Sequence, residues 1–284
     1  MNSSKSLILL SIAVLLGMIS SLFQPCFSPN IYARAYSLEK TDGSKYTLTL
    51  TIPPSLYQSY ISKGHPSTLN RFVTPQIFLQ VATQIGHDFV SNEDYANAIL
   101  MITRQIPQPQ GNVPLKYPVE TIIDNIGDCD VFSVLAASLM KARGLDVVLL
   151  EYPDHMNLGV YLPYKPSSSR IGQIAWYPYN GRNYYVAETT GGVTEGGVST
   201  PWRVGEDSGD YSHATIISLT DCDTSSPEQV AVSLALTTPP SAFSFPPIGY
   251  GLLAVLCIIV GGGFPLQIHV SWHATIWRRT IPWK

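Results

Sequence analysis

Hydrophobic and polar residues alternate along Tyr46–Ile52, where an apolar side chain occupies every second position. This period of two predicts a β-strand with one buried face. Residues 41–44, Thr-Asp-Gly-Ser, can form a turn, and Tyr36 and Leu38 repeat the spacing on its other side. We therefore expect residues 31–66 to open the fold with an antiparallel β-hairpin.

Two later regions have apolar residues at the spacing of an α-helix. Residues 68–105 predict two helices, and Ser91 is suited to begin the second because Asp94 follows three positions later. Residues 130–143 carry a regular apolar stripe, with Gly144 where a C-terminal cap belongs. The stripe consists of Val131, Val134, Leu135, Leu139 and Ala142. This is the clearest helix that the sequence predicts.

Three short apolar runs after that helix predict β-strands, at Val147–Leu150, Leu158–Leu162 and Tyr184–Ala187. Residues 107–118 hold four prolines and a glycine, so they predict a loop. Helices followed by strands indicate an α+β fold, and we assign residues 67–223 to one such domain.

The N-terminal residues 1–30 are dominated by the uncharged apolar run Leu7–Phe23. Only 13% of all residues are charged, against about 25% in ordinary soluble proteins, which suggests that part of the chain lies in lipid. The run is either a secretory signal peptide or an uncleaved signal anchor. We favour the anchor, because the small-x-small cleavage pattern at Ala33–Ala35 lies well beyond the run.

A second apolar run, Ile248–Leu266, predicts a transmembrane helix, since about 20 residues cross a bilayer core. Tryptophans and basic residues follow it, which is typical of a cytoplasmic flank, so we assign 267–284 to a cytoplasmic tail. The alternative is a buried apolar hairpin. Residues 224–247 are rich in Ser, Thr and Pro and predict an extended tether.

This topology predicts a membrane protein whose main domain is extracytoplasmic and whose anchors contact the lipid bilayer. The net charge of −3 does not favour a nucleic-acid partner. Outside the apolar runs and their edges, Cys129 and Cys222 are the cysteines that remain. Two are too few for a disulfide-stapled secreted domain, although one bridge between them is compatible with the sequence.

Cys129 lies in Gly127-Asp-Cys-Asp130, directly before the predicted helix. Unpaired backbone N–H groups and the positive end of the helix dipole favour a thiolate at this position. Asp128 and Asp130 oppose that charge, so the thiolate needs a cation nearby, and a histidine can supply one.

His155 lies in the turn before the strand at Leu158, and Glu188 ends the strand at Tyr184–Ala187. A thiol on a helix, with an imidazole and a carboxylate on neighbouring strands, fits the Cys–His–acid arrangement of nucleophilic catalysis. Taken singly, each residue has an ordinary explanation as a half-buried thiol, a solvated histidine or a charge at a strand end. Their order and local settings together support the catalytic interpretation, but the spacing alone does not decide between it and these ordinary explanations.

Three segments resemble the transglutaminase-like superfamily, whose members have a cysteine-protease-like fold. Tyr117–Gly144 is similar to its nucleophile segment, His155–Val160 to its histidine segment and Tyr184–Thr190 to its acid segment. The resemblance covers roughly residues 70–200 and is closest to the membrane-bound prokaryotic, especially archaeal, branch. It implies a papain-like core in which a nucleophile helix packs on an antiparallel sheet, with an N-terminal β-hairpin and two flanking membrane segments.

On this resemblance Cys129 is the nucleophile, His155 the general base and then acid, and Glu188 the orienting carboxylate. Many members of the superfamily have aspartate where this chain has Glu188. Many of this branch also have a second acidic residue where this chain has Val131. Neither departure removes a group that thiol attack requires.

The groups that would hold a developing oxyanion are less clearly indicated. The backbone N–H of Cys129 is one donor, and the Tyr117 hydroxyl or the Asn157 amide is a candidate second. A packed tyrosine beside Pro118 and a turn asparagine explain the same two residues equally well. No CxxC, HxxxH or HExxH spacing, phosphate loop or dinucleotide fingerprint occurs, so we expect no metal and no cofactor.

These observations predict a membrane-anchored, extracytoplasmic enzyme that acts on amide bonds of a peptide or protein through a thioester on Cys129. It would be a hydrolase (a peptidase) if water resolves the thioester and a transamidase if an amine does. The alternative is a catalytically inactive module of the same fold, for binding or assembly at the cell envelope. A third hypothesis is a structural envelope protein held by a bridge between Cys129 and Cys222.

Overall fold

The computed structural model describes residues 32–195, 198–207, 209, 213–225 and 228–237. The chain divides into two units, Met1–Thr237 and Thr238–Lys284, and every described residue belongs to the first. The predicted membrane segments, Leu7–Phe23 and Ile248–Leu266, lie outside the described residues, as does the predicted tail. Within the described ranges, no helix is both long enough and apolar enough to cross a bilayer.

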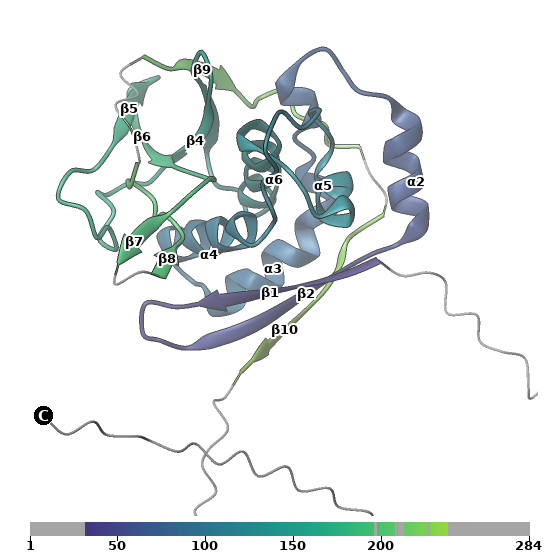
Figure 1. The fold of residues 1–284 in the computed structure, drawn as a ribbon, viewed down its shortest axis with the longest axis horizontal. Helices are drawn as coiled ribbons and strands as arrows, with labels where there is room; N and C mark the ends of the chain where they lie inside the picture. Colours follow the sequence, from purple (N-terminus) through teal and green to yellow (C-terminus); the bar gives the residue numbers. More distant parts are fainter. Residues whose placement is uncertain (1–31, 196–197, 208, 210–212, 226–227, 238–284) are drawn as a thin grey trace, which may run out of the picture. The chain divides into compact units, whose positions relative to one another are not determined.

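The described unit combines α-helices with antiparallel sheets (Figure 1). The helices are α2 (Pro54–Lys63), α3 (Leu79–Asp88), α4 (Asn92–Arg104), α5 (Pro118–Asp124) and α6 (Cys129–Ala142), with 3-10 turns η1 (Leu69–Phe72) and η2 (Pro75–Phe78). The first strands are β1 (Tyr32–Glu39), β2 (Lys45–Ile52), β3 (Val147–Glu151), β4 (Met156–Tyr161) and β5 (Trp176–Tyr179). The later strands are β6 (Arg182–Ala187), β7 (Val193–Glu195), β8 (Val198–Thr200), β9 (Thr215–Ser218) and β10 (Ala231–Leu236).

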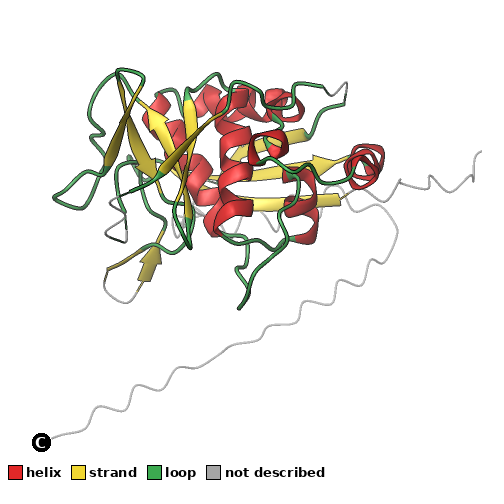
Figure 2. Ribbon diagram, turned by 90° about the horizontal axis from the view of Figure 1, so that it is seen from above, coloured by secondary structure: helices red, strands yellow, loops and turns green. Residues whose placement is uncertain are grey.

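The strands form sheets in the orders β1-β2-β10, β5-β6-β4-β3-β9 and β7-β8. Helices α3, α4 and α5 contact the three-stranded sheet, and α6 contacts those helices on one side and β3 and β4 on the other. Figure 2 shows the helices gathered beside the five-stranded sheet. The predicted α+β class, with a central helix packed on an antiparallel sheet, is confirmed.

The predicted N-terminal hairpin is confirmed, and it belongs to the main core. Tyr36 pairs with Leu48 across β1 and β2, and both side chains are buried. On its other edge β2 pairs with β10, where Leu234 lies opposite Leu48. The prediction of an extended tether over 224–247 is therefore wrong for Ala231–Leu236, because alternating apolar residues in this Ser- and Thr-rich segment complete the sheet.

The helix predictions hold where the apolar stripes are long. Helix α4 begins after Ser91, whose hydroxyl oxygen accepts the N–H of Asp94 at 3.0 Å. Helix α6 ends at Ala142, and Gly144 follows it with a φ of 87° and donates its N–H to the Lys141 carbonyl at 2.8 Å. This left-handed position favours glycine, because other residues meet a steric penalty there. Helices α2 and α5 were not predicted.

The five-stranded sheet curls around a small second core (Figure 1). One face packs on α6, while the other buries a separate cluster consisting of Val148, Leu150, Tyr152, Tyr184 and Val186. Gly159 of β4 allows this close packing, since a Cβ atom there would lie 2.9 Å from the Cβ of Tyr184. The turn that joins β3 to β4 and the segment after β6 both reach the start of α6, where Ser133 contacts Met156 and Thr189.

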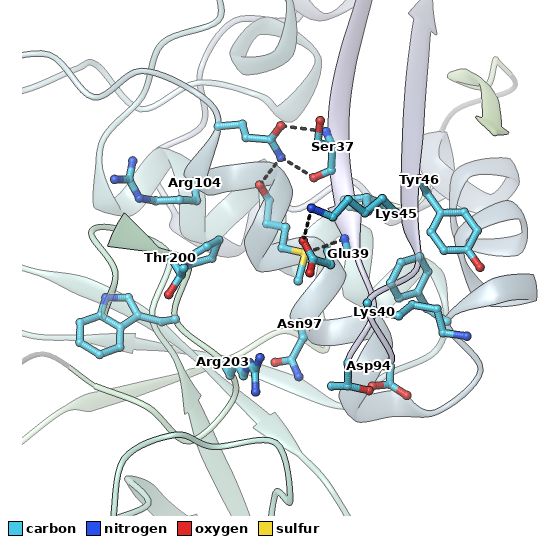
Figure 3. Close-up of a pocket in the computed structure, with 18 of the residues that line it drawn as sticks. Ser37, Glu39, Lys40, Lys45, Tyr46, Asp94, Asn97, Arg104, Thr200 and Arg203 are labelled. Atoms are coloured by element: carbon cyan, nitrogen blue, oxygen red, sulfur yellow. Dashed lines mark hydrogen bonds and ion pairs between the residues drawn. The ribbon is translucent and has the colours of Figure 1, made fainter. Parts of the chain in front are cut away.

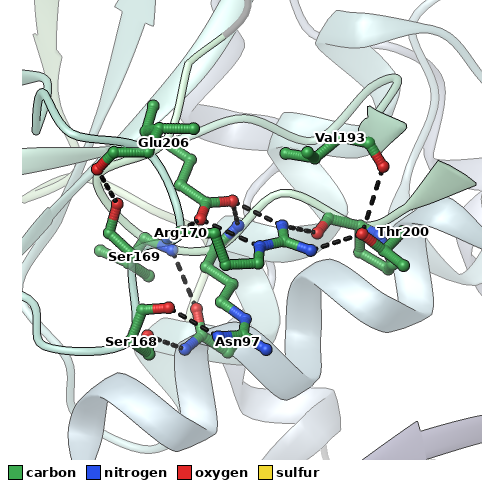
Figure 4. A network of polar contacts seen from close by, with 11 residues as sticks. Asn97, Ser168, Ser169, Arg170, Val193, Thr200 and Glu206 are labelled. Atoms are coloured by element: carbon green, nitrogen blue, oxygen red, sulfur yellow. Dashed lines mark hydrogen bonds and ion pairs between the residues drawn. The ribbon is translucent and has the colours of Figure 1, made fainter. Parts of the chain in front are cut away.

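A buried ion pair fixes the segment that follows β8 (Figure 4). Glu206 is fully buried and accepts the backbone N–H of Arg170 at 2.5 Å and its guanidinium at 2.6 Å. Asn97 of α4 accepts the Val204 N–H at 2.9 Å from the same segment. The Gly205 N–H in turn donates to the Val186 carbonyl at 2.7 Å. The network therefore ties α4 to the end of β6, two residues before Glu188.

Candidate active site

Cys129 is the first residue of α6, and its side chain is half-buried with a free thiol. Asp128 precedes the helix, and its carbonyl accepts the Phe132 N–H at 2.9 Å as the first helical hydrogen bond. Gly127 leaves room for this start, because a Cβ atom there would lie 2.5 Å from the Phe132 ring. Cys222 is also a free thiol, so the two cysteines form no bridge in the described structure.

His155 is placed by a tight turn between β3 and β4. The Tyr152 N–H donates to the His155 carbonyl at 2.9 Å, which closes the turn, and Asp154 lies within it as predicted. The Tyr152 ring stacks on the imidazole with 6.2 Å between centroids and 23° between planes. His155 thereby directs its ring toward the start of α6.

The three candidate residues Cys129, His155 and Glu188 come together in space. His155 Nε2 lies 2.8 Å from Oε2 of Glu188, and the ring also hydrogen-bonds to the Cys129 side chain. Since Nε2 faces the carboxylate, we infer that Nδ1 faces the thiol. Glu188 is buried, and its other oxygen accepts the N–H and the hydroxyl of Thr190 at 2.8 and 2.7 Å. The carboxylate is therefore fixed in position.

Helix α6 is tied to both neighbouring segments by Ser133, one turn after Cys129. Its hydroxyl donates to the Met156 carbonyl at 3.1 Å, next to His155. It also lies 3.4 Å from the hydroxyl of Thr189, next to Glu188. Ser133 is fully buried. Its two contacts therefore hold α6, the start of β4 and the segment after β6 at a fixed spacing from inside the core.

The electrostatics of the site strongly favour a protonated imidazole. Burial of the His155 ring acts to lower its pKa, and this is the largest single effect. Hydrogen bonds to Cys129 and Glu188, with the charges of both, together outweigh it and raise the pKa from 6.5 to about 10. At neutral pH His155 is therefore an imidazolium held between a thiol group and a carboxylate.

The two aspartates that flank Cys129 do not act as two full negative charges. Burial, then the hydrogen bond and charge of Asp128, together raise the pKa of Asp130 from 3.8 to about 7. Asp128 is held by the Val113 N–H, which donates to its Oδ2 at 2.7 Å. Below about pH 7 Asp130 is therefore mostly protonated, which weakens the opposition of its side chain to a thiolate at Cys129.

Asn157 and Tyr117, the two sequence candidates for holding an oxyanion, lie in different surroundings. Asn157 of β4 is fully buried, and its Oδ1 lies 3.0 Å from His155 Nε2. Tyr117 is buried in an aromatic cluster with Tyr60, His65 and Phe72. Asn157 thus belongs to the assembled site, whereas the Tyr117 ring packs between α2 and η1.

Sequence reasoning did not identify several residues that build the site. Ser133 lies in the segment that resembles the nucleophile helix and Thr190 follows Glu188, but nothing in their spacing indicates which group their hydroxyls contact. The contact between Asn157 and His155 was only weakly indicated by the sequence. Residues two apart on a strand project to the same face, so His155 just before β4 and Asn157 within it can meet.

The candidate site is separate from a pocket of about 780 Å³ at another place on the unit (Figure 3). Glu39 and Lys45 of the hairpin line that pocket opposite Arg104 of α4, with Thr200 of β8 beside them. None of Cys129, His155 and Glu188 lines it. Within the described ranges, no group of three or more potential ligands is placed to hold a metal ion.

Comparisons with known proteins add little to this geometry. No protein-family model matches the chain, and no curated protein matches it. Among solved structures, the chain is similar to a crystal structure named "Putative Cysteine Protease" from Cytophaga hutchinsonii, with 14% sequence identity. The match covers 74% of this chain and 79% of that chain, with a TM-score of 0.27. A TM-score this low carries no argument, so the site is interpreted from its own chemistry.

Proposed function

We propose that this protein is a thiol-dependent amide hydrolase or transamidase in which Cys129 is the nucleophile. The observation that carries the proposal is the His155 imidazole, which hydrogen-bonds to the thiol group on one side and lies 2.8 Å from Glu188 on the other. A Cys–His–carboxylate series with a raised histidine pKa is the arrangement that generates a nucleophilic thiolate. The resemblance to the transglutaminase-like superfamily supports the same assignment.

In the proposed mechanism His155 holds the proton of the Cys129 thiol before substrate binds. The thiolate sulfur attacks the amide carbonyl carbon, and the carbonyl oxygen becomes an oxyanion facing the backbone N–H of Cys129 at the start of α6. The imidazolium then gives its proton to the departing amine, and the C–N bond breaks to leave a thioester. Glu188 holds the ring through Nε2 in each step.

The thioester is resolved by a second nucleophile that His155 deprotonates. Water gives a carboxylic acid and completes hydrolysis, while a primary amine gives a new amide and completes transamidation. Either nucleophile gives a proton to His155 as the C–S bond breaks, which regenerates the thiolate and imidazolium, so atoms and charge balance over the cycle. The described residues contain no feature that selects water over an amine.

The proposed setting is the extracytoplasmic side of a membrane, with a peptide or protein as substrate. This part rests on the sequence alone, on the uncharged runs Leu7–Phe23 and Ile248–Leu266 and on the basic residues after the second run. Cysteine labelling from outside intact cells tests it. Labelling of Cys222 by a membrane-impermeant maleimide is expected, and protection of Cys222 until the cells are lysed would contradict it.

The activity is tested on the full-length protein with carboxymethylated casein and a fluorescent primary amine as probes. Hydrolysis gives new peptide termini or ammonia, and transamidation attaches the amine to casein. Either activity is expected for the wild type, with complete loss in Cys129→Ser. A Cys129→Ser protein that keeps the activity would overturn the assignment. A wild type inactive on both arms and lacking a reactive thiolate would favour the binding-module alternative.

A further inference from the structure

The imidazole of His155 has two hydrogen-bond acceptors at one nitrogen. Nε2 lies 2.8 Å from Oε2 of Glu188 and 3.0 Å from Oδ1 of Asn157. One N–H serves both, as a shared hydrogen bond whose acceptors come from different strands. Glu188 follows β6, while Asn157 lies inside β4 and pairs with Leu150 of β3. Both acceptors are therefore held by the sheet.

The orientation of the Asn157 amide follows from the neighbouring carboxylate. With Nε2 protonated toward Glu188, an amide nitrogen at 3.0 Å would place donor against donor, whereas the oxygen accepts. This orientation leaves Nδ2 of Asn157 buried near the Tyr152 side chain, without a hydrogen bond of good geometry among the described residues. An unpaired buried donor destabilises the folded state. The side chain therefore contributes its oxygen to His155 at a cost to stability.

The surroundings of Asn157 would accept an apolar residue. Its side chain is fully buried, and the residue opposite it on β3, Leu150, is a buried apolar residue. A leucine is close to asparagine in length and has no donor to leave unpaired. Buried donors without a good hydrogen bond occur mostly at functional sites. The amide is therefore better explained by its contact with His155 than by packing.

We propose that Asn157 is a positioning residue that, together with Glu188, keeps the His155 proton on Nε2 and so leaves Nδ1 for the Cys129 thiol. A single acceptor allows the ring to turn about the Nε2–H direction. A second acceptor on another strand, with Tyr152 stacked on the ring face, limits that rotation. The inference rests on the proposed function, because it takes Cys129 as the reacting atom.

The same contacts explain why Asn157 is not assigned to oxyanion binding. Its amide nitrogen is covered from solvent, so a substrate oxygen cannot reach that donor without opening the sheet. The role assigned to Asn157 is therefore to orient His155. Its substitution is expected to change how readily the imidazole takes the proton of the Cys129 thiol.

Two substitutions separate positioning from packing. Asn157→Leu keeps the branching of the side chain and removes the acceptor, while Asn157→Asp keeps an acceptor oxygen at the same place. Carbamidomethylation by iodoacetamide of the full-length protein is followed from pH 5 to pH 9 by peptide mass spectrometry. Cys222 gives an internal reference within each sample, since it is also free and half-buried. The midpoint of thermal unfolding is measured in parallel.

For Asn157→Leu we expect the rate at Cys129 near pH 6–7 to fall about 3- to 10-fold, the effect of one ordinary hydrogen bond. The rate at Cys222 stays constant, and the unfolding midpoint stays level or rises. For Asn157→Asp we expect a pH profile close to that of the wild type.

Two results would overturn the positioning role. The first is an Asn157→Leu protein with the wild-type rate at Cys129. The second is a loss at Cys129 accompanied by a lower unfolding midpoint and faster labelling of Cys222, which indicates a packing role. Failure of the proposed function gives a different signature, in which wild-type Cys129 already reacts no faster than Cys222 near pH 6–7.

Discussion

Replacing Glu188 with glutamine removes one charge from the site and leaves the shape of the side chain almost unchanged. Oε1 of Glu188 accepts two hydrogen bonds from Thr190, so these donors would hold the oxygen of the glutamine. The amide nitrogen would then occupy the position 2.8 Å from Nε2 of His155. Two donors repel, so we expect the imidazole to move its proton to Nδ1, the nitrogen that faces Cys129.

The magnitude follows from what holds the proton on His155. Burial is the largest single effect on the His155 pKa and lowers it. The pKa is nevertheless about 10, because the interactions with Cys129 and Glu188 together raise it by more. Without the carboxylate we expect burial to dominate and the ring to be neutral at pH 7. An ordinary thiol, with a pKa of about 8.5, is about 3% thiolate at that pH. The alkylation rate at Cys129 is therefore expected to fall about 10- to 30-fold.

Acyl transfer should suffer more than alkylation, because the wrong tautomer also removes the general base. A loss of about 10³- to 10⁴-fold is expected for Glu188→Gln. Peptide mass spectrometry measures the alkylation, and circular dichroism checks folding. Glu151→Gln removes an exposed carboxylate at the end of β3 and serves as the control. A Glu188→Gln protein within a factor of two of the wild type, or an equal loss in the control, would refute this reasoning.

Two further substitutions test the charges around the site. The pKa of Asp130 is raised from 3.8 to about 7, so its stabilising proton is fully bound below pH 3.8 and is lost as pH rises through 7. Asp130→Asn should therefore raise the free energy of unfolding by about 1–3 kcal/mol at pH 8 and by little at pH 4. Glu206→Gln breaks the buried pair with Arg170 and should lower that free energy by about 3–5 kcal/mol.

Urea unfolding measures both effects, and each has its own control. For Asp130→Asn the control is pH itself, and a gain of equal size at pH 4 and pH 8 would show that the proton is not involved. For Glu206→Gln the control is Glu39→Gln, which removes an exposed ion pair with Lys45 and should cost less than about 1 kcal/mol. Equal costs for Glu206 and Glu39 would contradict the importance of the buried network.

The sequence predicted those parts of the fold that rest on long local patterns. The apolar residues of α6 and the alternation of β2 each extend over several residues. Helix α6 is buried on all sides from Val131 to Met140, while β2 buries one face. Helix α5 covers only Pro118–Asp124, too short for a periodic stripe. Strand β10 is defined by pairing with β2, which is distant in the sequence, and its Ser- and Thr-rich surroundings suggested a tether. Local sequence patterns do not predict pairing between strands that are so far apart in the sequence.

The site was predictable where residue type and order carry the chemistry. The sequence places a thiol at a helix start, a histidine in the turn between two strands and a carboxylate at a strand end. This order indicated that Cys129, His155 and Glu188 would meet, and the structure brings them together. The supporting contacts were not predictable, because they depend on rotamers and on the curl of the sheet. Ser133 and Asn157 are examples, since each acts through one oxygen whose partner only the fold determines.

The central claim is that Cys129 and His155 share a proton as a thiolate and an imidazolium. The ultraviolet absorbance of the thiolate measures this directly, as the difference between the wild type and Cys129→Ser from pH 4 to pH 10. We predict that the difference is already present at pH 7 in the wild type and that His155→Ala removes it there. A difference that appears only through about pH 8.5, the ordinary thiol range, and is the same in His155→Ala would contradict the account.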